Sequence, residues 1–190
     1  MALISASTIL TSLCLFHITL AYFFYTNPHA IADQALVWVL GEAVGMPQIQ
    51  SFSTPSPTSS FLAVTLFLVG LSDLTTLSMP EEIWLVHYWG AQAPVRIVLF
   101  GCLTLFTYLT APPASSTSPS MPSRLSSHHY PPAYGPANGG SEGLRNRVFF
   151  AFTLLEFLSW FWAWVTLREE AAAFAARKRR RSSSNTRERS

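Results

Sequence analysis

The sequence predicts an all-α membrane protein, a multi-pass transmembrane helical bundle of about four spans with one added amphipathic helix. Two observations lead to this fold class. Charged residues make up only 12% of the 190-residue chain and hydrophobic residues make up 49%, whereas soluble domains carry about 25% charged residues. The apolar residues are also gathered in runs long enough for a helix to cross a bilayer.

The first span is expected over residues 3–25, a run that contains no Asp, Glu, Lys or Arg. About 20 apolar residues are needed to cross the hydrocarbon core of a bilayer, and this run has that length. A cleaved signal peptide is the alternative, but the basic residues that usually begin one are missing. We therefore expect an anchor helix that stays in the protein.

An amphipathic helix is expected over residues 28–45. Pro28 suits the first turn of a helix, and Gly45 suits its end. Apolar residues recur at helical spacing, but Asp33 and Glu42 interrupt them. This pattern favours a helix that lies at the membrane interface or packs on the bundle. A fifth span stays open, because the segment just reaches spanning length.

The remaining apolar runs predict three further spans, near residues 61–78, 94–110 and 148–167. Three aromatic residues, Trp84, Tyr88 and Trp89, lie in the connection before the second of these runs. Trp and Tyr are enriched at the depth of the lipid headgroups. We therefore expect these three side chains at the membrane surface.

Residues 111–147 are expected to form a disordered loop. The segment is dominated by Pro, Ser, Ala and Gly, and such a composition cannot bury enough apolar surface to offset the entropy of ordering. His128 and His129 are adjacent within it. A bare pair of imidazoles is weak evidence for a metal site, so a solvated loop is the better interpretation.

The C-terminal tail, residues 168–190, holds eight of the twelve Lys and Arg residues. Its basic cluster consists of Arg177, Lys178, Arg179, Arg180 and Arg181. Such blocks also contact nucleic acid, but directly after a span the expected partner is anionic lipid headgroups and not nucleic acid. The positive-inside rule places this tail, and with four spans the N-terminus, in the cytosol. Arg145 and Arg147, next to the last span on the other side, run against this orientation.

Asp73 and Arg96 are two of the three charged residues that fall within spans. Each costs about 2.5–3.5 kcal/mol at the centre of a membrane helix, so such residues usually pair or line a polar cavity. Asp73 lies near the end of one span and Arg96 near the start of the next, at similar depth. We expect an ion pair between the two helices. The alternative is that Arg96 extends to the headgroups while Asp73 stays hydrated near the interface.

Glu156 is the third intramembrane charge and lies near the middle of the last span. Thr153, Ser159 and Trp160 fall on roughly the same helical face. We expect this face to turn inward and to hydrogen-bond with a neighbouring helix.

The chain lacks the short motifs of common enzymes. It contains no HExxH, no Gly-rich phosphate loop, no nucleophile elbow and no CxxC. We therefore expect no catalytic residues, no cofactor and no metal site. A small transporter or ion-channel subunit that uses Asp73, Arg96 and Glu156 along a polar path is the alternative function. A membrane-embedded lipid enzyme has least support, because no cluster of His and acidic residues is evident.

Several segments resemble a known family. They are GEAVGMPQI (41–49), GLSDL (70–74), APVRIVLFGCLTLFTYL (93–109) and FTLLEFLSWFWAWVTLREE (152–170). In this order they are similar to the fungal family named "increased loss of mitochondrial DNA protein", small multi-pass proteins of the endoplasmic reticulum membrane. The resemblance covers residues 1–110 and 147–170, while the Pro/Ser-rich loop and the basic tail depart from it.

The resemblance implies residence in the endoplasmic reticulum and a link to the maintenance of mitochondrial DNA, and it supplies no catalytic residues. Together with the residues, it leads us to expect a non-enzymatic integral membrane protein. Its effect on mitochondrial DNA is expected to be indirect, through lipid supply, organelle contact or scaffolding. Its expected partners are the lipid bilayer and other membrane proteins.

Overall fold

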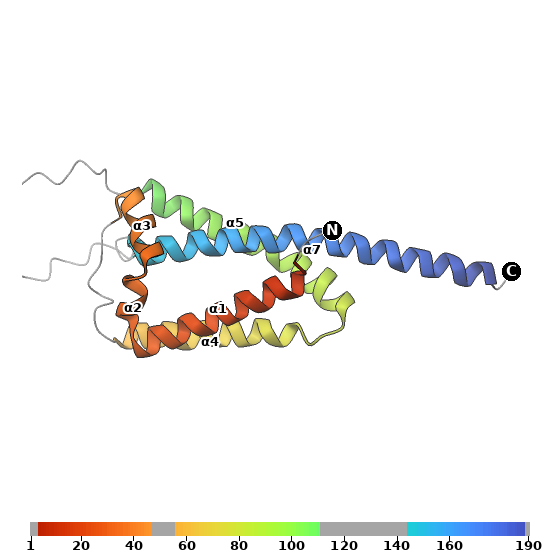
Figure 1. Cartoon of the computed structure of the whole chain (residues 1–190), viewed down its shortest axis with the longest axis horizontal. Coiled ribbons are helices and arrows are strands. Elements are labelled where there is room, and N and C mark those ends of the chain that lie inside the picture. The colour runs from red at the N-terminus through yellow and green to blue at the C-terminus, as the bar shows by residue number, and fades with distance from the viewer. Residues whose placement is uncertain (1–3, 47–55, 111–143, 189–190) are drawn as a thin grey trace, which may run out of the picture.

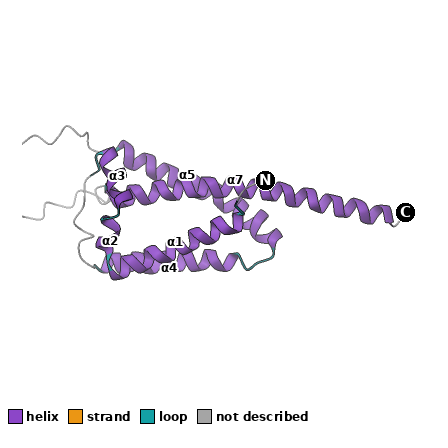
Figure 2. Ribbon diagram, viewed as in Figure 1, coloured by secondary structure: helices purple, strands orange, loops and turns teal. Residues whose placement is uncertain are grey.

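The structure, a computed structural model, describes residues 4–46, 56–110 and 144–188. These residues form helices joined by short connections (Figure 2). Four of the helices are long and apolar enough to cross a membrane, so the predicted all-α class with about four spans is confirmed. The loop predicted over 111–147 falls, up to residue 143, outside the described residues.

The four long helices coincide with the four apolar runs but differ from them at their ends. The first two are α1 (Ala6–Thr26) and α4 (Pro57–Thr76). The third is a π-helical segment, η2 (Ile83–Tyr88), that continues directly into α5 (Trp89–Leu109). The fourth is α7 (Arg147–Glu188), which contains an apolar stretch long enough to cross a membrane. Helix α7 therefore extends well past the predicted last span, into the basic tail.

The starts of the helices follow from local capping. Helix α4 begins at Pro57, earlier than residue 61, because Ser56 and Ser59 form a reciprocal capping box and Pro57 occupies the first turn. In α1 the side chain of Ser5 accepts a hydrogen bond from the backbone N–H of Thr8. These caps satisfy amide groups that have no partner within the helix.

The amphipathic helix predicted over 28–45 is two short helices, α2 (Pro28–Ala32) and α3 (Ala35–Val44). The chain breaks at Asp33 and Gln34, and Gln34 has an extended backbone. Gly45 ends α3 in the left-handed conformation with a φ of 71°, which glycine adopts without steric penalty. Neither helix reaches spanning length. They lie across one end of the bundle, where α3 packs on α7 (Figure 1).

The long helices are arranged as two pairs. Helix α1 packs along α4, and α5 packs along α7, while fewer contacts join α1 to α7 (Figure 1). Gly70 permits the close approach within the first pair, because a Cβ there would lie 3.0 Å from the backbone oxygen of Cys14. Close backbone approach at small residues is how membrane helices gain packing energy. We call the boundary between the two pairs the seam.

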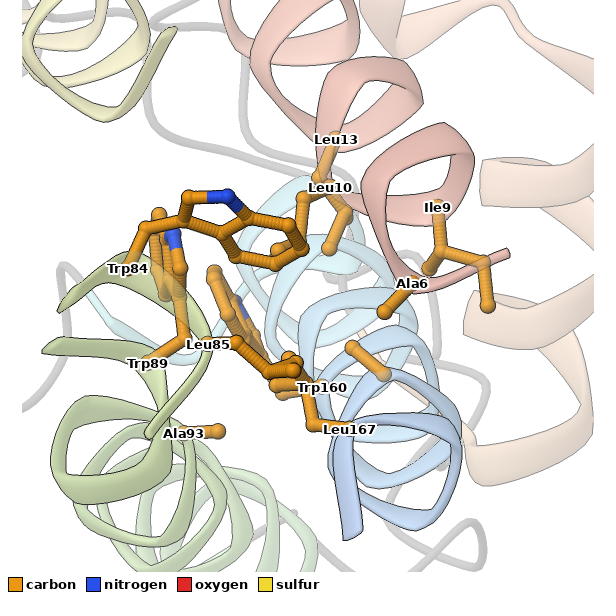
Figure 3. Close-up of a cluster of buried hydrophobic side chains, with 11 residues drawn as sticks. Ala6, Ile9, Leu10, Leu13, Trp84, Leu85, Trp89, Ala93, Trp160 and Leu167 are labelled. Carbon is orange, nitrogen blue, oxygen red and sulfur yellow. The ribbon is translucent and has the colours of Figure 1, made fainter. Parts of the chain in front are cut away.

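Two buried apolar clusters hold the seam at its two ends. One contains the three tryptophans Trp84, Trp89 and Trp160 together with the first turns of α1 (Figure 3). The other joins the last turns of α1 to α2, α3, α4 and the first turns of α7. His17 of α1 and Glu156 of α7 lie between these clusters along their helices.

The three aromatic residues expected at the membrane surface pack against protein: Trp84 of η2 and Trp89 of α5 are buried, and Tyr88 is partly buried. Trp84 is 8% exposed and Trp89 is fully buried. The ring of Trp89 stacks on Trp160 of α7, with 5.3 Å between the ring centroids and 24° between the planes. Because α5 begins near Trp89 and not near residue 94, these rings belong to the helix interface.

Candidate functional site: a polar cluster across four helices

Each long helix contributes one ionisable side chain to the middle of the bundle. They are His17 of α1, Asp73 of α4, Arg96 of α5 and Glu156 of α7. His17 and Asp73 are each 3% exposed and Glu156 is 1% exposed, while the side chain of Arg96 is 20% exposed. We call these four residues the polar cluster.

Asp73 and Arg96 form a bidentate ion pair, as expected from their matched depth. Arg96 Nη1 donates to Asp73 Oδ2 at 2.6 Å, and Nη2 donates to Oδ1 at 2.9 Å. Two parallel charge-assisted hydrogen bonds of this kind fix the orientation of both groups. Arg96 therefore does not extend to the headgroups in place of pairing, and Asp73 is not left hydrated at an interface.

The ion pair crosses the seam. Helix α4 belongs with α1 and α5 belongs with α7, so α4 and α5 are not packed along each other. The long Arg96 side chain bridges the space between them. The pair therefore joins α4 to α5, the second and third spans, as expected, and in doing so it joins the two halves of the bundle.

Aromatic rings complete the surroundings of Arg96. Its guanidinium carbon lies 4.6 Å from the ring centroid of Trp160 and 5.2 Å from that of Trp89. A cation over an aromatic face gains about 0.5–2 kcal/mol, more where water is excluded. These contacts and the two hydrogen bonds together offset the cost of placing a charge at this depth.

Glu156 continues the cluster toward α1. Its Oε2 accepts a hydrogen bond of 2.8 Å from Nε1 of Trp160, and its Oε1 lies 3.0 Å from Nε2 of His17. The inward orientation predicted for Glu156 is therefore observed. The indole donor comes from its own helix, and the contact with His17 is the one that crosses the seam.

His17 is the member of the cluster that the sequence analysis missed. It is a single imidazole within an apolar run, and that isolation is the signal that the sequence analysis passed over. Its Nδ1 has no hydrogen-bond partner among the described residues, nor has Nε1 of Trp89. The sequence showed no convergence of His and acid, yet the fold brings His17 and Glu156 together from opposite ends of the chain.

Two further polar contacts close the ends of the seam. The backbone N–H of Ala6, at the start of α1, donates to Glu170 Oε1 of α7 at 2.7 Å, and an acidic side chain is favourable at a helix N-terminus. At the other end, Arg147 donates from Nε to the carbonyl of Met46 at 2.7 Å and from Nη2 to Glu42 at 2.8 Å. Arg147, which runs against the positive-inside rule, thus holds α3 on α7.

The family of the protein can now be stated. Residues 4–177 match the family model described as "Ilm1: Increased loss of mitochondrial DNA protein 1". The chain belongs to the Ilm1 family. The match covers all four residues of the polar cluster and ends at the first residue of the basic cluster. No curated protein matches the chain, and no solved structure matches it.

The basic cluster of this Ilm1 family member lies on the part of α7 that projects beyond the other helices (Figure 1). Two of its members pair within the chain: Arg177 with Glu81 at 3.5 Å, and Lys178 with Glu82. Lys178 lowers the pKa of Glu82, first through its hydrogen bond and then through its charge. Because all four groups are exposed, these pairs add little to stability.

The polar cluster of this Ilm1 family member contains one ion pair and one contact between an imidazole and a carboxyl group. Asp73 and Arg96 neutralise each other. Glu156 Oε2 accepts a hydrogen bond from the Trp160 indole, while its Oε1 lies 3.0 Å from His17 Nε2 and has no hydrogen-bond partner among the described residues. Among the described residues, no group of three or more His, Cys, Asp and Glu side chains could hold a metal ion. The cluster draws its members from all four long helices.

Proposed function

We propose that this Ilm1 family protein is a non-enzymatic integral membrane protein of the endoplasmic reticulum that supports mitochondrial DNA indirectly. Lipid supply, organelle contact and scaffolding are the routes we consider. Membership of the Ilm1 family supports the link to mitochondrial DNA, and the four long apolar helices support the membrane location.

The observation that carries the non-enzymatic part of this proposal is the pairing inside the polar cluster. Intramembrane charges face the bundle interior or a water-filled cavity, and many of them pair with one another. Here Asp73 and Arg96 use both carboxylate oxygens and two guanidinium nitrogens on each other. Their geometry serves the contact between helix pairs, which suits a scaffold that presents its surface to other membrane proteins.

A transporter or ion-channel subunit is the second candidate. The observation in its favour is that the fold gathers one ionisable side chain from each of the four long helices. A polar path would need these residues for flux, whereas a scaffold needs them for packing. The two functions therefore predict different effects of removing the charge without changing the shape.

The test uses cells of the source organism that lack the gene and are complemented with tagged variants. Asp73→Asn and Glu156→Gln remove the charge but keep the shape, and Glu169→Gln is the control because Glu169 is exposed. We expect the wild-type protein in the endoplasmic reticulum, and retention of mitochondrial DNA that follows protein abundance in every variant. Immunoblotting and quantitative amplification of mitochondrial DNA measure both.

Two results count against the proposal. Loss of mitochondrial DNA at normal abundance of Asp73→Asn or Glu156→Gln supports the transporter or channel instead. A tagged wild-type protein found in a mitochondrial membrane contradicts the endoplasmic reticulum location.

Proximity labelling from the C-terminal tail identifies the membrane proteins that the scaffold binds.

A further inference from the structure

An apolar groove runs along the seam between α1 and α7. Its first part is a cavity of about 260 Å³ that is walled by α1 and α7 and closed at one end by α2 and α3. Phe16, Phe24, Val37 and Phe152 are among its lining residues. It is open on the outside, since Leu36 on its rim is 50% exposed.

A second cavity, of about 400 Å³, continues the first along the same two helices. Phe16 and Leu155 line both cavities, and Trp162 lines the far part. The hydroxyl groups of Thr8 and Ser12 on its wall are already bonded within the first turns of α1. We call the two cavities together the seam groove.

The position of the seam groove decides which medium meets it. Helices α1 and α7 are two of the four helices that can cross a membrane, so the groove opens sideways into the hydrocarbon of the bilayer. Thr19 and Gln34 are the polar residues lining its first part. The Thr19 hydroxyl donates to the carbonyl of Leu15, and the Gln34 amide donates to the carbonyl of Ala30. An apolar occupant therefore leaves neither side chain without a hydrogen-bond partner.

The volumes separate an acyl chain from a helix of another protein. An apolar cavity of roughly 150 Å³ holds one benzene, about 25 Å³ per carbon, so 260 Å³ holds roughly ten carbons. The second cavity, at 400 Å³, holds roughly sixteen on the same measure. A helix about 10 Å wide fills roughly 400 Å³ in a single turn, so the groove cannot enclose a helix, whereas it can enclose an extended acyl chain.

We propose that the seam groove binds one acyl chain of a membrane phospholipid. This inference deepens the proposed function, because it gives the lipid-supply route a site. It rests on the membrane placement of α1 and α7, but not on the scaffold role. The occupant is held by shape and by contact with the aromatic rings of Phe16, Phe24 and Phe152.

The test fills the groove without disturbing the core. Thr19 and Leu36 line the groove but are exposed, so Thr19→Trp and Leu36→Trp place a ring in the groove and not in a packed interior. Val98→Trp is the matched control, because Val98 of α5 is 65% exposed and lies outside the groove. The purified full chain is placed in nanodiscs of dioleoyl phosphatidylcholine that contain a phosphatidylcholine with a diazirine on one acyl chain.

After irradiation, mass spectrometry maps the adducts, and native mass spectrometry counts the lipids retained in detergent. We expect adducts on α1 and α7 groove residues several-fold above those on α5, and one retained lipid. Both signals fall several-fold in Thr19→Trp and Leu36→Trp and stay unchanged in Val98→Trp.

Even labelling of α5 and the groove overturns the proposal, as does labelling that either filled variant leaves intact. A retained protein subunit in place of the lipid also overturns it, because a helix then occupies the seam. Circular dichroism checks that each variant is folded, and the two filled variants are independent of each other. None of these outcomes depends on retention of mitochondrial DNA, so this inference and the proposed function fail separately.

Discussion

Arg96 is the residue at which the two halves of the bundle meet. Its guanidinium binds Asp73 of α4 and lies over the rings of Trp89 and Trp160. Only a planar fork can present two hydrogen bonds to a carboxylate while its face lies on an aromatic ring. A lysine at this position keeps the charge but loses the second hydrogen bond and the flat contact with the indoles.

Removing either member of this pair leaves the other charge buried without a partner. We expect Asp73→Ala and Arg96→Ala each to lower the free energy of unfolding by about 3–5 kcal/mol. The double variant is expected to lose clearly less than the sum, because it strands no charge. Unfolding of the purified protein in mixed detergent micelles, followed by circular dichroism, measures all three.

A matched acidic residue provides the control for this cycle. Asp33 pairs with His29 on the surface, where both side chains are more than half exposed, so Asp33→Ala is expected to change the unfolding free energy by about 1 kcal/mol or less. If the double variant loses as much unfolding free energy as the two single variants together, Asp73 and Arg96 do not pair in the purified protein.

Helix α7 contacts α1, α2, α3, α5 and η2. It packs along α5, contacts α1 through Glu156 and Glu170, and receives α3 at Arg147. It then continues beyond the bundle as a single helix to Glu188 (Figure 1). The basic cluster therefore lies on a continuous helix. Lys178 of this cluster contacts Glu82, in the connection between α4 and η2.

The pairing of Lys178 with Glu82 makes this docking depend on pH. The hydrogen bond and charge of Lys178 hold the pKa of Glu82 below its ordinary value of 4.5. A lowered pKa in the folded state means that the pair stabilises the docked tail above pH 4.5. That contribution is lost as the pH falls through the lowered pKa.

Nuclear magnetic resonance titration of labelled Glu side chains in micelles checks the sign of this shift. Glu82 is expected to titrate below 4.5, and Lys178→Met is expected to raise its pKa toward that value. Arg180→Met serves as the control, because Arg180 is not a partner of Glu82. A Glu82 that titrates at its ordinary pKa in the unmodified protein rules out a docked tail under these conditions.

At the scale of the whole molecule, the start of α1 and the C-terminal tail lie at the same end of the bundle. The start of α1 meets α7 at Glu170, on the side from which the tail projects. With four spans, the N-terminus and the tail lie on the same side of the membrane. The basic cluster predicts that this side is the cytosol.

Engineered glycosylation tests this orientation, because the natural chain has no Asn-x-Ser/Thr acceptor. Leu125→Asn creates an acceptor between the third and fourth long helices, and Arg187→Thr creates one in the tail. We expect sugar on the first variant alone, since transfer occurs in the lumen. A mobility shift removed by endoglycosidase measures it, and a glycosylated tail reverses the topology.

The sequence by itself determined the number of long helices, the all-α class and the meeting of Asp73 with Arg96. The number of long helices depends on the length of the apolar runs. The meeting of Asp73 with Arg96 depends on a short connection, which makes two helices antiparallel and so places the two residues at similar depth. Gly45 likewise set the end of α3 through its own backbone preference, whereas the start of α4 at Pro57 was not predicted.

Only the tertiary structure decided which helices pair, where Trp84 and Trp89 lie, and that His17 meets Glu156. In a helix of a soluble protein, the polar face is the one that meets solvent. Lipid is as apolar as a helix interface, so the sequence of a membrane helix gives little indication of which face turns inward. The rotation of each helix about its axis is set by contacts between residues far apart in the chain. That rotation created both the polar cluster and the seam groove.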